Sequence, residues 1–248
     1  MKLGTLYLIP VTLGDDNISE LISKSLPPEV IATAQKLEQF VVETEKPARQ
    51  FLSAIKTAKP VRELSLNLLN EHTLDKDVAA LLAPLLAGHD VGLMSDAGCP
   101  GIADPGAKLV ALAHKKGIKV VPFVGPSSIL LSLMASGLNG QQFAFLGYLP
   151  VDKTARIVRL KEIEKRSQTH NETQIFIETP YRNMQMLEAI LSACHANTRL
   201  CVACDISLAS ELIATKSISE WKQSALPELN KKPTVFLLLV INLFLIKN

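Results

Sequence analysis

The chain has 248 residues, of which 48% are hydrophobic and 20% charged, which fits one large or two modest globular domains with a real core. Its formal net charge of +2 neither requires nor excludes a nucleic-acid partner. The first apolar run is broken by Pro10 and is too short for a signal peptide. The run from Val235 to Ile246 is too short to span a bilayer and suits a terminal core strand with a frayed end. We therefore expect no membrane partner and a cytoplasmic location.

Short apolar strands alternate with helices in the first half of the chain, and this order predicts a parallel sheet covered by helices. The expected elements are, in order, strand 6–9, helix 18–25 ended by Pro27-Pro28, strand 40–42, helix 48–57, a segment over 64–69 that fits either type, an amphipathic helix over 74–87 kinked at Pro84, strand 91–94, helix 107–116 and strand 118–121. Asp104-Pro105 is expected to start the helix that continues over 107–116, with Asp104 as its N-cap and Pro105 at the first helical position.

The stretch from Val91 to Gly106 is the most informative part of the sequence. A short apolar strand enters a loop rich in Gly, Pro and Asp and leaves through a helix, which is where α/β proteins place ligands. The glycines allow the backbone to approach a ligand closely, and Asp96 supplies a carboxylate just past the strand end. A tight turn without a ligand is the alternative. A second loop of the same kind over 122–128 favours the ligand site.

More strands than helices are expected in the second half, which predicts a mixed sheet. The expected elements are a helix from Ser127 to about Gly137, strand 143–149, a basic amphipathic helix over 152–166, a mobile polar loop over 167–173, strand 174–177, helix 183–193, strands 199–204 and 212–215, helix 218–223 and strand 234–240. The basic helix suits a nucleic-acid backbone, although a solvated helix face is the more frequent explanation. The domains are expected to be 1–123 and 124–248.

Four cysteines, Cys99, Cys194, Cys201 and Cys204, are expected to be reduced thiols. Cys201 and Cys204 have the C-x-x-C spacing, but residues three apart on a strand point to opposite faces. A zinc ribbon needs a second pair, and only Cys194-His195 lies nearby in the sequence. Core thiols and no metal are therefore predicted.

Nearly the whole chain carries a set of short motifs in one order. They are L-Y-L-I-P at 6–10, L-M-S-D-A-G-C-P at 93–100 followed by D-P-G at 104–106, V-V-P-F-V-G-P-S-S at 120–128, F-L-G-Y-L-P at 145–150 and F-I-E-T-P-Y-R at 176–182. In these motifs the chain resembles the tetrapyrrole (corrin/porphyrin) methylase superfamily. Within it, the chain is most similar to the branch that 2′-O-methylates a cytidine of small-subunit ribosomal RNA.

This resemblance implies two α/β domains, paired as a homodimer, with S-adenosylmethionine folded into the cleft between the domains. It also implies that the cofactor is surrounded by strand-end residues, namely Pro10, Ser95, Asp96, Ala97, Gly98, Cys99, Ile102, Ser127 and Ser128. The absence of a G-x-G-x-x-G motif from the sequence agrees with this, because S-adenosylmethionine has no pyrophosphate to be held.

Methyl transfer from a sulfonium depends on placing the acceptor in line with the methyl group. A ribose hydroxyl acceptor must also lose its proton, and the candidate bases are Glu43, Asp104 and Glu178. Arg182 is the candidate for holding a phosphate or carboxylate of the substrate. Its alternative role is a salt bridge with Glu178.

Two segments depart from the ribosomal RNA branch. Residues 10–16 are P-V-T-L-G-D-D where the branch has P-T-P-I-G-N-L, and residues 42–46 are V-E-T-E-K where the branch has A-E-D-T-R, so that Glu43 remains. This pattern indicates a divergent paralogue with its cofactor loops kept and its acceptor side altered. Three functions stay open: a methyltransferase acting on an RNA nucleotide of the small ribosomal subunit, the same chemistry on a small molecule such as a tetrapyrrole, and a non-catalytic protein that binds the cofactor or RNA.

Overall fold

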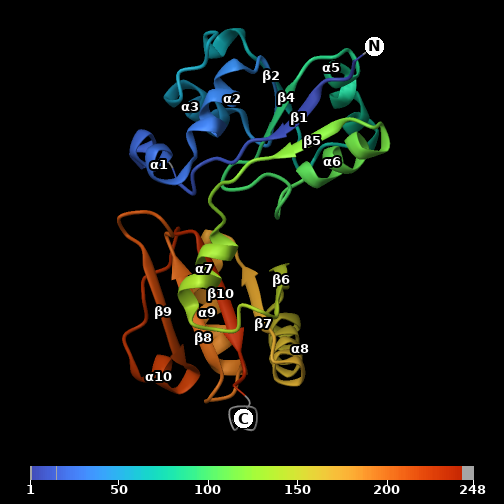
Figure 1. Ribbon diagram of the computed structural model, residues 1–248. Coiled ribbons are helices and arrows are strands. Elements are labelled where there is room, and N and C mark those ends of the chain that lie inside the picture. The colour runs from blue at the N-terminus through green and yellow to red at the C-terminus, as the bar shows by residue number, and fades with distance from the viewer. Residues whose placement is uncertain (1, 15, 242–248) are drawn as a thin grey trace. The chain divides into compact units, whose positions relative to one another are not determined.

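The computed structural model describes residues 2–14 and 16–241 (Figure 1). The chain divides into two compact units, Met1–Ser127 and Ser128–Asn248, so the change comes after Ser127 rather than after residue 123. The end of the predicted tail strand, beyond residue 241, lies outside the described residues. Among the described helices, none is both long and apolar enough to cross a membrane.

The first unit is built on a parallel sheet with the strand order β3-β2-β4-β1-β5. Its strands are β1 (Thr5–Leu8), β2 (Gln39–Val42), β3 (Ser65–Leu68), β4 (Val91–Met94) and β5 (Lys119–Pro122). All of β4 is buried, as expected for a central strand covered on both faces. The predicted parallel sheet is confirmed, and the ambiguous segment over 64–69 forms a strand.

Helices cover both faces of this sheet. They are α1 (Ile18–Ser25), α2 (Pro28–Lys36), α3 (Glu45–Ala54), α4 (Asp75–Val78), α5 (Ala83–Leu86) and α6 (Gly106–Lys115), with short 3₁₀ turns η1 (Val61–Glu63) and η2 (Ala79–Leu82). One apolar cluster joins Phe40 of β2 to Phe51 of α3, and a second joins Leu6 of β1 to Leu85 and Leu109. The two clusters hold the sheet between two layers of helices.

Two expectations for these helices were wrong. Helix α2 was not predicted, because Pro27-Pro28 indicated only the end of α1. Pro28 instead opens α2, since the first helical turn does not need the missing proline N–H. The single helix expected over 74–87 is three short pieces, α4, η2 and α5, and the last of these begins beside Pro84.

The second unit contains a mixed sheet in the order β6-β7-β10-β8-β9, in which β6 pairs with β7 in parallel and the other neighbours pair antiparallel. Its elements are α7 (Ser128–Ser136), β6 (Phe143–Tyr148), α8 (Lys153–His170), β7 (Thr173–Ile177), η3 (Pro180–Arg182), α9 (Asn183–Ala193), β8 (Arg199–Cys204), β9 (Leu212–Ser217), α10 (Ile218–Gln223) and β10 (Thr234–Leu239). Phe176 stacks on Phe236 in its core, with ring centroids 5.8 Å apart. The predicted mixed sheet is confirmed.

Three cysteines belong to this second unit. Cys201 and Cys204 are buried in β8, and Cys194 is buried after α9. Burial raises the pKa of each thiol, to about 12 for Cys194. These thiols are therefore protonated at neutral pH and pack as small apolar groups.

The segment over 167–173 is not the mobile loop that its polar composition indicated. Helix α8 continues to His170, and Asn171 ends it in the left-handed conformation. Glu172 is then buried and accepts hydrogen bonds from Arg166 Nε at 2.7 Å and Gln174 Nε2 at 2.6 Å. The polar residues are thus used to fix the turn between α8 and β7.

Replacing Glu172 with glutamine is expected to lower the free energy of unfolding by about 1–2 kcal/mol at pH 7, since Arg166 is half exposed. The hydrogen bonds from Arg166 hold the pKa of Glu172 below its usual range. The stabilisation is therefore present above the unfolded-state pKa and is lost as the pH falls through the folded-state pKa. Urea unfolding of both proteins across pH 3–7 should show the difference closing in acid. The exposed Arg159–Glu162 pair supplies the control Glu162→Gln, for which little change is expected.

Candidate active site

Three loops of the first unit leave the same edge of the parallel sheet, because β2, β4 and β1 are adjacent and parallel. The loop after β1 is joined to the loop after β4 by a hydrogen bond from Val11 N to Gly98 O of 2.9 Å. The loop after β2 begins with Glu43, whose amide donates to Met94 O at 3.3 Å. The three loops therefore form one continuous surface at the carboxyl ends of the strands, where open α/β sheets bind ligands.

The loop after β4 is held in shape by Asp104. Its Oδ2 accepts from Gly101 N at 2.7 Å and its Oδ1 accepts from Gly106 N at 2.6 Å. Burial raises the pKa of Asp104, and these backbone hydrogen bonds oppose the rise. The predicted helix start is displaced, because α6 begins at Gly106 with Pro105 in the N-cap position. Both carboxylate oxygens are engaged by the loop, so the arrangement favours a structural role for Asp104.

Glu43 and Asp96 meet where β2 and β4 end. The Glu43 carboxylate accepts from Asp96 N at 3.1 Å, and Thr44 Oγ1 donates to Asp96 Oδ2 at 2.8 Å. Burial raises the pKa of Glu43, and the charges of Asp96 and Asp104 add to the rise. Thr44 was not among the predicted site residues, although a hydroxyl directly after a strand end is a signal of the same kind as Asp96.

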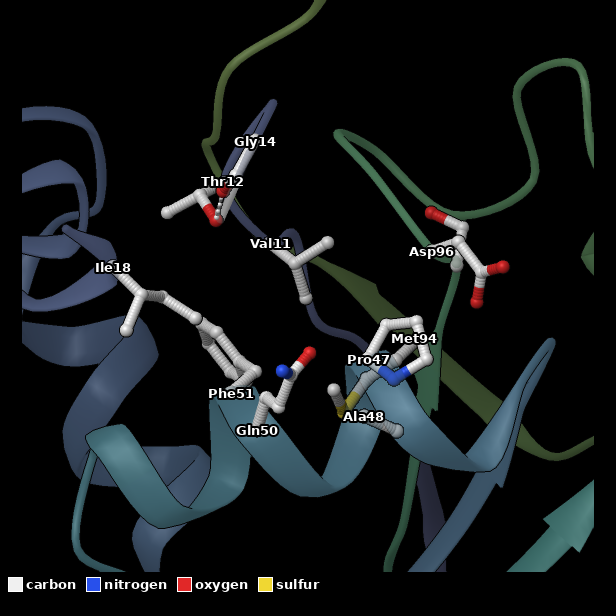
Figure 2. A pocket seen from close by; sticks show the side chains of 11 residues that line it. Val11, Thr12, Gly14, Ile18, Pro47, Ala48, Gln50, Phe51, Met94 and Asp96 are labelled. Atoms are coloured by element: carbon white, nitrogen blue, oxygen red, sulfur yellow. Dashed lines mark hydrogen bonds between the residues drawn. The ribbon is translucent and has the colours of Figure 1, made fainter. Parts of the chain in front are cut away.

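A small pocket opens beside these carboxylates and lies entirely within the first unit. It has a volume of about 210 Å³. Figure 2 shows the side chains around it, among them Val11 from the loop after β1 and Gln50 and Phe51 from α3. The pocket is lined by Val11, Thr12, Gly14, Ile18, Pro47, Ala48, Gln50, Phe51, Met94, Ser95 and Asp96. Ser95 and Asp96 were predicted site residues, whereas Gln50 and Phe51 were not.

The other side of the loop after β4 packs against the segment that follows β5. The Cys99 thiol lies 3.3 Å from Pro126 O, and burial raises its pKa. A Cβ on Gly125 would lie 2.2 Å from Pro10 Cβ, so only glycine allows this approach. The structure thus brings Pro10 and the residues from Ser95 to Cys99 together. Ile102 lies in the same loop with 54% of its surface exposed.

The remaining predicted residues fall at or beyond the unit boundary. Ser127 ends the first unit and Ser128 opens α7 of the second. Glu178 lies past the end of β7, its side chain fully buried, and its Oε1 accepts from Arg182 Nε at 3.0 Å and Nη2 at 2.6 Å. The expected salt bridge is therefore present. Glu178 Oε2 is buried and makes no hydrogen bond with the described residues.

The charges of the basic helix α8 are partly used within the second unit. Arg156 is buried, and its Nη1 donates to Val151 O at 3.3 Å. Arg159 and Arg166 are paired with Glu162 and Glu172. The basic face is thus smaller than the sequence indicated, and its exposed lysines are Lys153, Lys161 and Lys165.

Known proteins share this fold and sequence pattern. The sequence profile of the tetrapyrrole (corrin/porphyrin) methylases matches residues 9–221. A ribosomal RNA small subunit methyltransferase I of Vibrio cholerae serotype O1 is 30% identical over 235 residues, covering 95% of this chain and 76% of that protein. Its counterpart in Escherichia coli O157:H7 is 30% identical over 217 residues, covering 88% and 70%. The crystal structure of the methyltransferase CobJ has a TM-score of 0.63 at 16% identity, covering 95% of this chain and 94% of that one, which shows a shared fold.

The two sheets define an α/β protein with a parallel and a mixed unit, and the family profile together with the named relatives makes it a methyltransferase. The chain belongs to the tetrapyrrole (corrin/porphyrin) methylase family. The family that the motifs indicated is therefore confirmed, and the enzyme uses a methyl donor.

If Asp96 binds the methyl donor as predicted, replacing it with alanine should weaken donor binding by about 10- to 100-fold, the effect of losing one charged hydrogen-bond acceptor. Calorimetric titration with S-adenosylmethionine and S-adenosylhomocysteine measures the change. Thr44→Val is the matched control, because it removes the bond to Asp96 Oδ2 and keeps the carboxylate. If the Asp96→Ala variant bound the donor as tightly as the wild type does, Asp96 would not be a donor-binding residue.

Proposed function

We propose that this enzyme transfers a methyl group from S-adenosylmethionine to a ribose 2′-hydroxyl in small-subunit ribosomal RNA. The observation that carries the proposal is the alignment of nearly the whole chain with relatives named ribosomal RNA small subunit methyltransferase I, covering 95% and 88% of it. The family model alone would also accommodate a tetrapyrrole acceptor. The named relatives are what favours the ribosomal RNA acceptor.

The loop after β4 has the chemistry that S-adenosylmethionine requires. Asp96 Oδ2 accepts from Thr44, whereas Oδ1 makes no hydrogen bond with another described residue, which suits a ribose hydroxyl or the amino group of the donor. Gly98 has a φ of +71°, and a Cβ there would lie 3.2 Å from both Leu13 Cδ2 and Pro126 O. Pro10, Ser95, Ala97, Cys99 and Ile102 lie in or beside the same loop and are proposed as further donor contacts, whereas the proposed role of Ser127 and Ser128 rests on the resemblance alone.

Glu43 is the general base of the proposed reaction. When bound, S-adenosylmethionine supplies a methyl carbon that a nucleophile can attack with loss of a neutral thioether. The 2′-hydroxyl oxygen forms the new bond to that carbon, the carbon–sulfur bond breaks, and the hydroxyl proton passes to Glu43. The raised pKa of Glu43 suits proton transfer, because it brings the base closer to the working pH. Asp104 is less suited, since backbone amides occupy both of its oxygens.

Arg182 is proposed to bind the RNA phosphate backbone. Glu178 fixes its guanidinium through two hydrogen bonds, and 30% of the side chain remains exposed. A guanidinium oriented in this way can still donate to a phosphate. In this proposal Arg182 both forms the salt bridge with Glu178 and binds a phosphate of the substrate. Glu178 is then a residue that positions Arg182 and not a general base. The lysines of α8 are proposed to add non-specific attraction to RNA.

The test uses labelled S-adenosylmethionine and small ribosomal subunits from a strain lacking this protein. We expect label in the small-subunit RNA, in dinucleotides that resist alkaline hydrolysis because the 2′-oxygen is methylated. Label in a low-molecular-mass fraction, with none in RNA, would indicate a tetrapyrrole-like acceptor. Normal donor affinity with no transfer to any cellular fraction would indicate a non-catalytic binding protein.

We also propose that the enzyme is a cytoplasmic homodimer. The buried protonated thiols suit a reducing compartment. The homodimer is the assembly that the family resemblance implies. Light scattering is expected to give twice the chain mass of 27.0 kDa.

A further inference from the structure

The pocket of the first unit is distinct in its chemistry from the loop proposed for the methyl donor. Its walls are largely apolar, since they include Val11, Ile18, Pro47, Phe51 and Met94 (Figure 2). A flat, uncharged ring suits such walls better than a charged group does. The polar groups are confined to a few positions, which is the usual composition of a site that orients one small ligand.

Gln50 supplies the pocket with a side-chain amide that is available to a ligand. It is exposed on α3 and lines the pocket, and its side-chain carboxamide makes no hydrogen bond with another described residue. Figure 2 shows its carboxamide directed into the space between Phe51 and Pro47. A carboxamide presents a donor and an acceptor side by side, and this pair matches the adjacent donor and acceptor on the edge of a nucleobase.

The size of the pocket limits what it can hold. Its volume of about 210 Å³ is below the range of about 300–1,000 Å³ for sites that enclose drug-sized ligands. This volume suits one ring system and does not suit a tetrapyrrole macrocycle or a whole molecule of S-adenosylmethionine. The pocket shares Ser95 and Asp96 with the donor loop, so its occupant would lie next to the donor.

We infer that this pocket receives the base of the acceptor nucleotide after the base has left its stack in the RNA. The inference rests on the proposed function and assigns to this pocket the selection of the acceptor nucleotide. Proteins that recognise RNA by sequence commonly bind bases that have been splayed out of the helix. Phe51 and Pro47 enclose the ring, Gln50 binds its edge, and the attached ribose lies at the mouth near Glu43 and Asp96. The unstacking cost is repaid by these contacts and places the 2′-hydroxyl for transfer.

The first test blocks the pocket with a larger side chain at Gln50. Gln50→Trp is expected to raise the KM for RNA by at least about tenfold and to leave the dissociation constant for S-adenosylmethionine within about twofold of the wild type. Ala32→Trp is the matched control, because Ala32 is exposed on α2 and does not line the pocket. Gln50→Leu keeps the size of the side chain and removes its hydrogen bonds, and a loss of about tenfold in kcat/KM is expected.

The second test removes the base from the substrate. An RNA fragment with an abasic acceptor nucleotide should bind the wild type more weakly than the intact fragment does, and Gln50→Trp should not weaken it further. Equal effects of Gln50→Trp on the intact and abasic fragments would overturn the base pocket while leaving the proposed function in place. Transfer by the wild type to a tetrapyrrole fraction and not to RNA would overturn both. Loss of donor binding in Gln50→Trp would instead assign the pocket to S-adenosylmethionine and overturn the inference.

Discussion

Gly98→Val is expected to reduce S-adenosylmethionine affinity by about 100-fold or more, because the substitution adds left-handed strain and a steric clash at once. The φ of Gly98 is +71°, and a Cβ would lie 3.2 Å from Leu13 Cδ2 and 3.2 Å from Pro126 O. The two further methyl groups of valine require more space than these atoms leave. Gly98 O also accepts from Val11 N, so a displaced Gly98 moves two loops of the site.

A second glycine separates backbone strain from the clash. Gly117 has a φ of +68° and no heavy atom within 4 Å of the position of a Cβ, and it lies between α6 and β5. Gly117→Val should therefore lose stability to a similar extent through its backbone and keep its donor affinity. Calorimetric titration of both variants, with thermal unfolding as the measure of folding, makes the comparison. Equal affinities of the two variants would show that the loop after β4 does not bind the donor.

The strand, loop and helix over 91–115 could be predicted from sequence because all their determinants are local. The buried strand β4, the glycines at 98, 101 and 106 and the start of α6 follow one another without a break. The mixed sheet was predictable because strand-like runs outnumber helical segments in the second half of the chain. Helix α2 was missed because a proline can either end one helix or occupy the first turn of the next. The pair Pro27-Pro28 is compatible with both, and Pro28 is the first residue of α2.

The pocket could not be predicted, because its residues come from three separate segments. Val11 follows β1, Gln50 lies on α3 and Met94 ends β4, and only the strand order β2-β4-β1 brings them together. A similar limit applies to Glu172. Its partner Arg166 was predicted to be the last residue of a helix. Because α8 in fact continues to His170, the ion pair between Arg166 and Glu172 could not be predicted without that longer helix.

The proposed acceptor side of the enzyme depends on one carboxylate, Glu43, which the sequence identifies as a candidate base. Within the altered segment over 42–46, Glu43 is the residue that the chain shares with the ribosomal RNA branch. It lies beside Asp96, and its Oε2 accepts a hydrogen bond from Asp96 N. Thr44 occupies the next position and bonds to the Asp96 carboxylate. The altered segment therefore still holds the donor loop, and its departures from the branch need not remove the base.

Glu43→Gln is expected to lower kcat for methyl transfer by about 10²- to 10⁴-fold, the usual contribution of a general base, with donor affinity unchanged. Glutamine keeps an oxygen that can accept from Asp96 N, so the loop should stay in place. Stability should not fall at neutral pH. Burial raises the folded-state pKa of Glu43 above its unfolded value, so its ionisation disfavours folding as the pH rises through that interval, and glutamine removes this cost.

The pH dependence distinguishes a base from a residue that only supports the loop. A base must be deprotonated, so kcat/KM of the wild type should rise with pH and level off above a pKa that is higher than usual for a glutamate. The variant should lack this rise. Glu45→Gln is the matched control, since Glu45 begins α3 and forms an exposed pair with Arg49, and less than about a twofold change is expected. A Glu43→Gln enzyme that kept the wild-type pH profile at reduced kcat would assign proton removal to another group and leave Glu43 as a support for the donor loop.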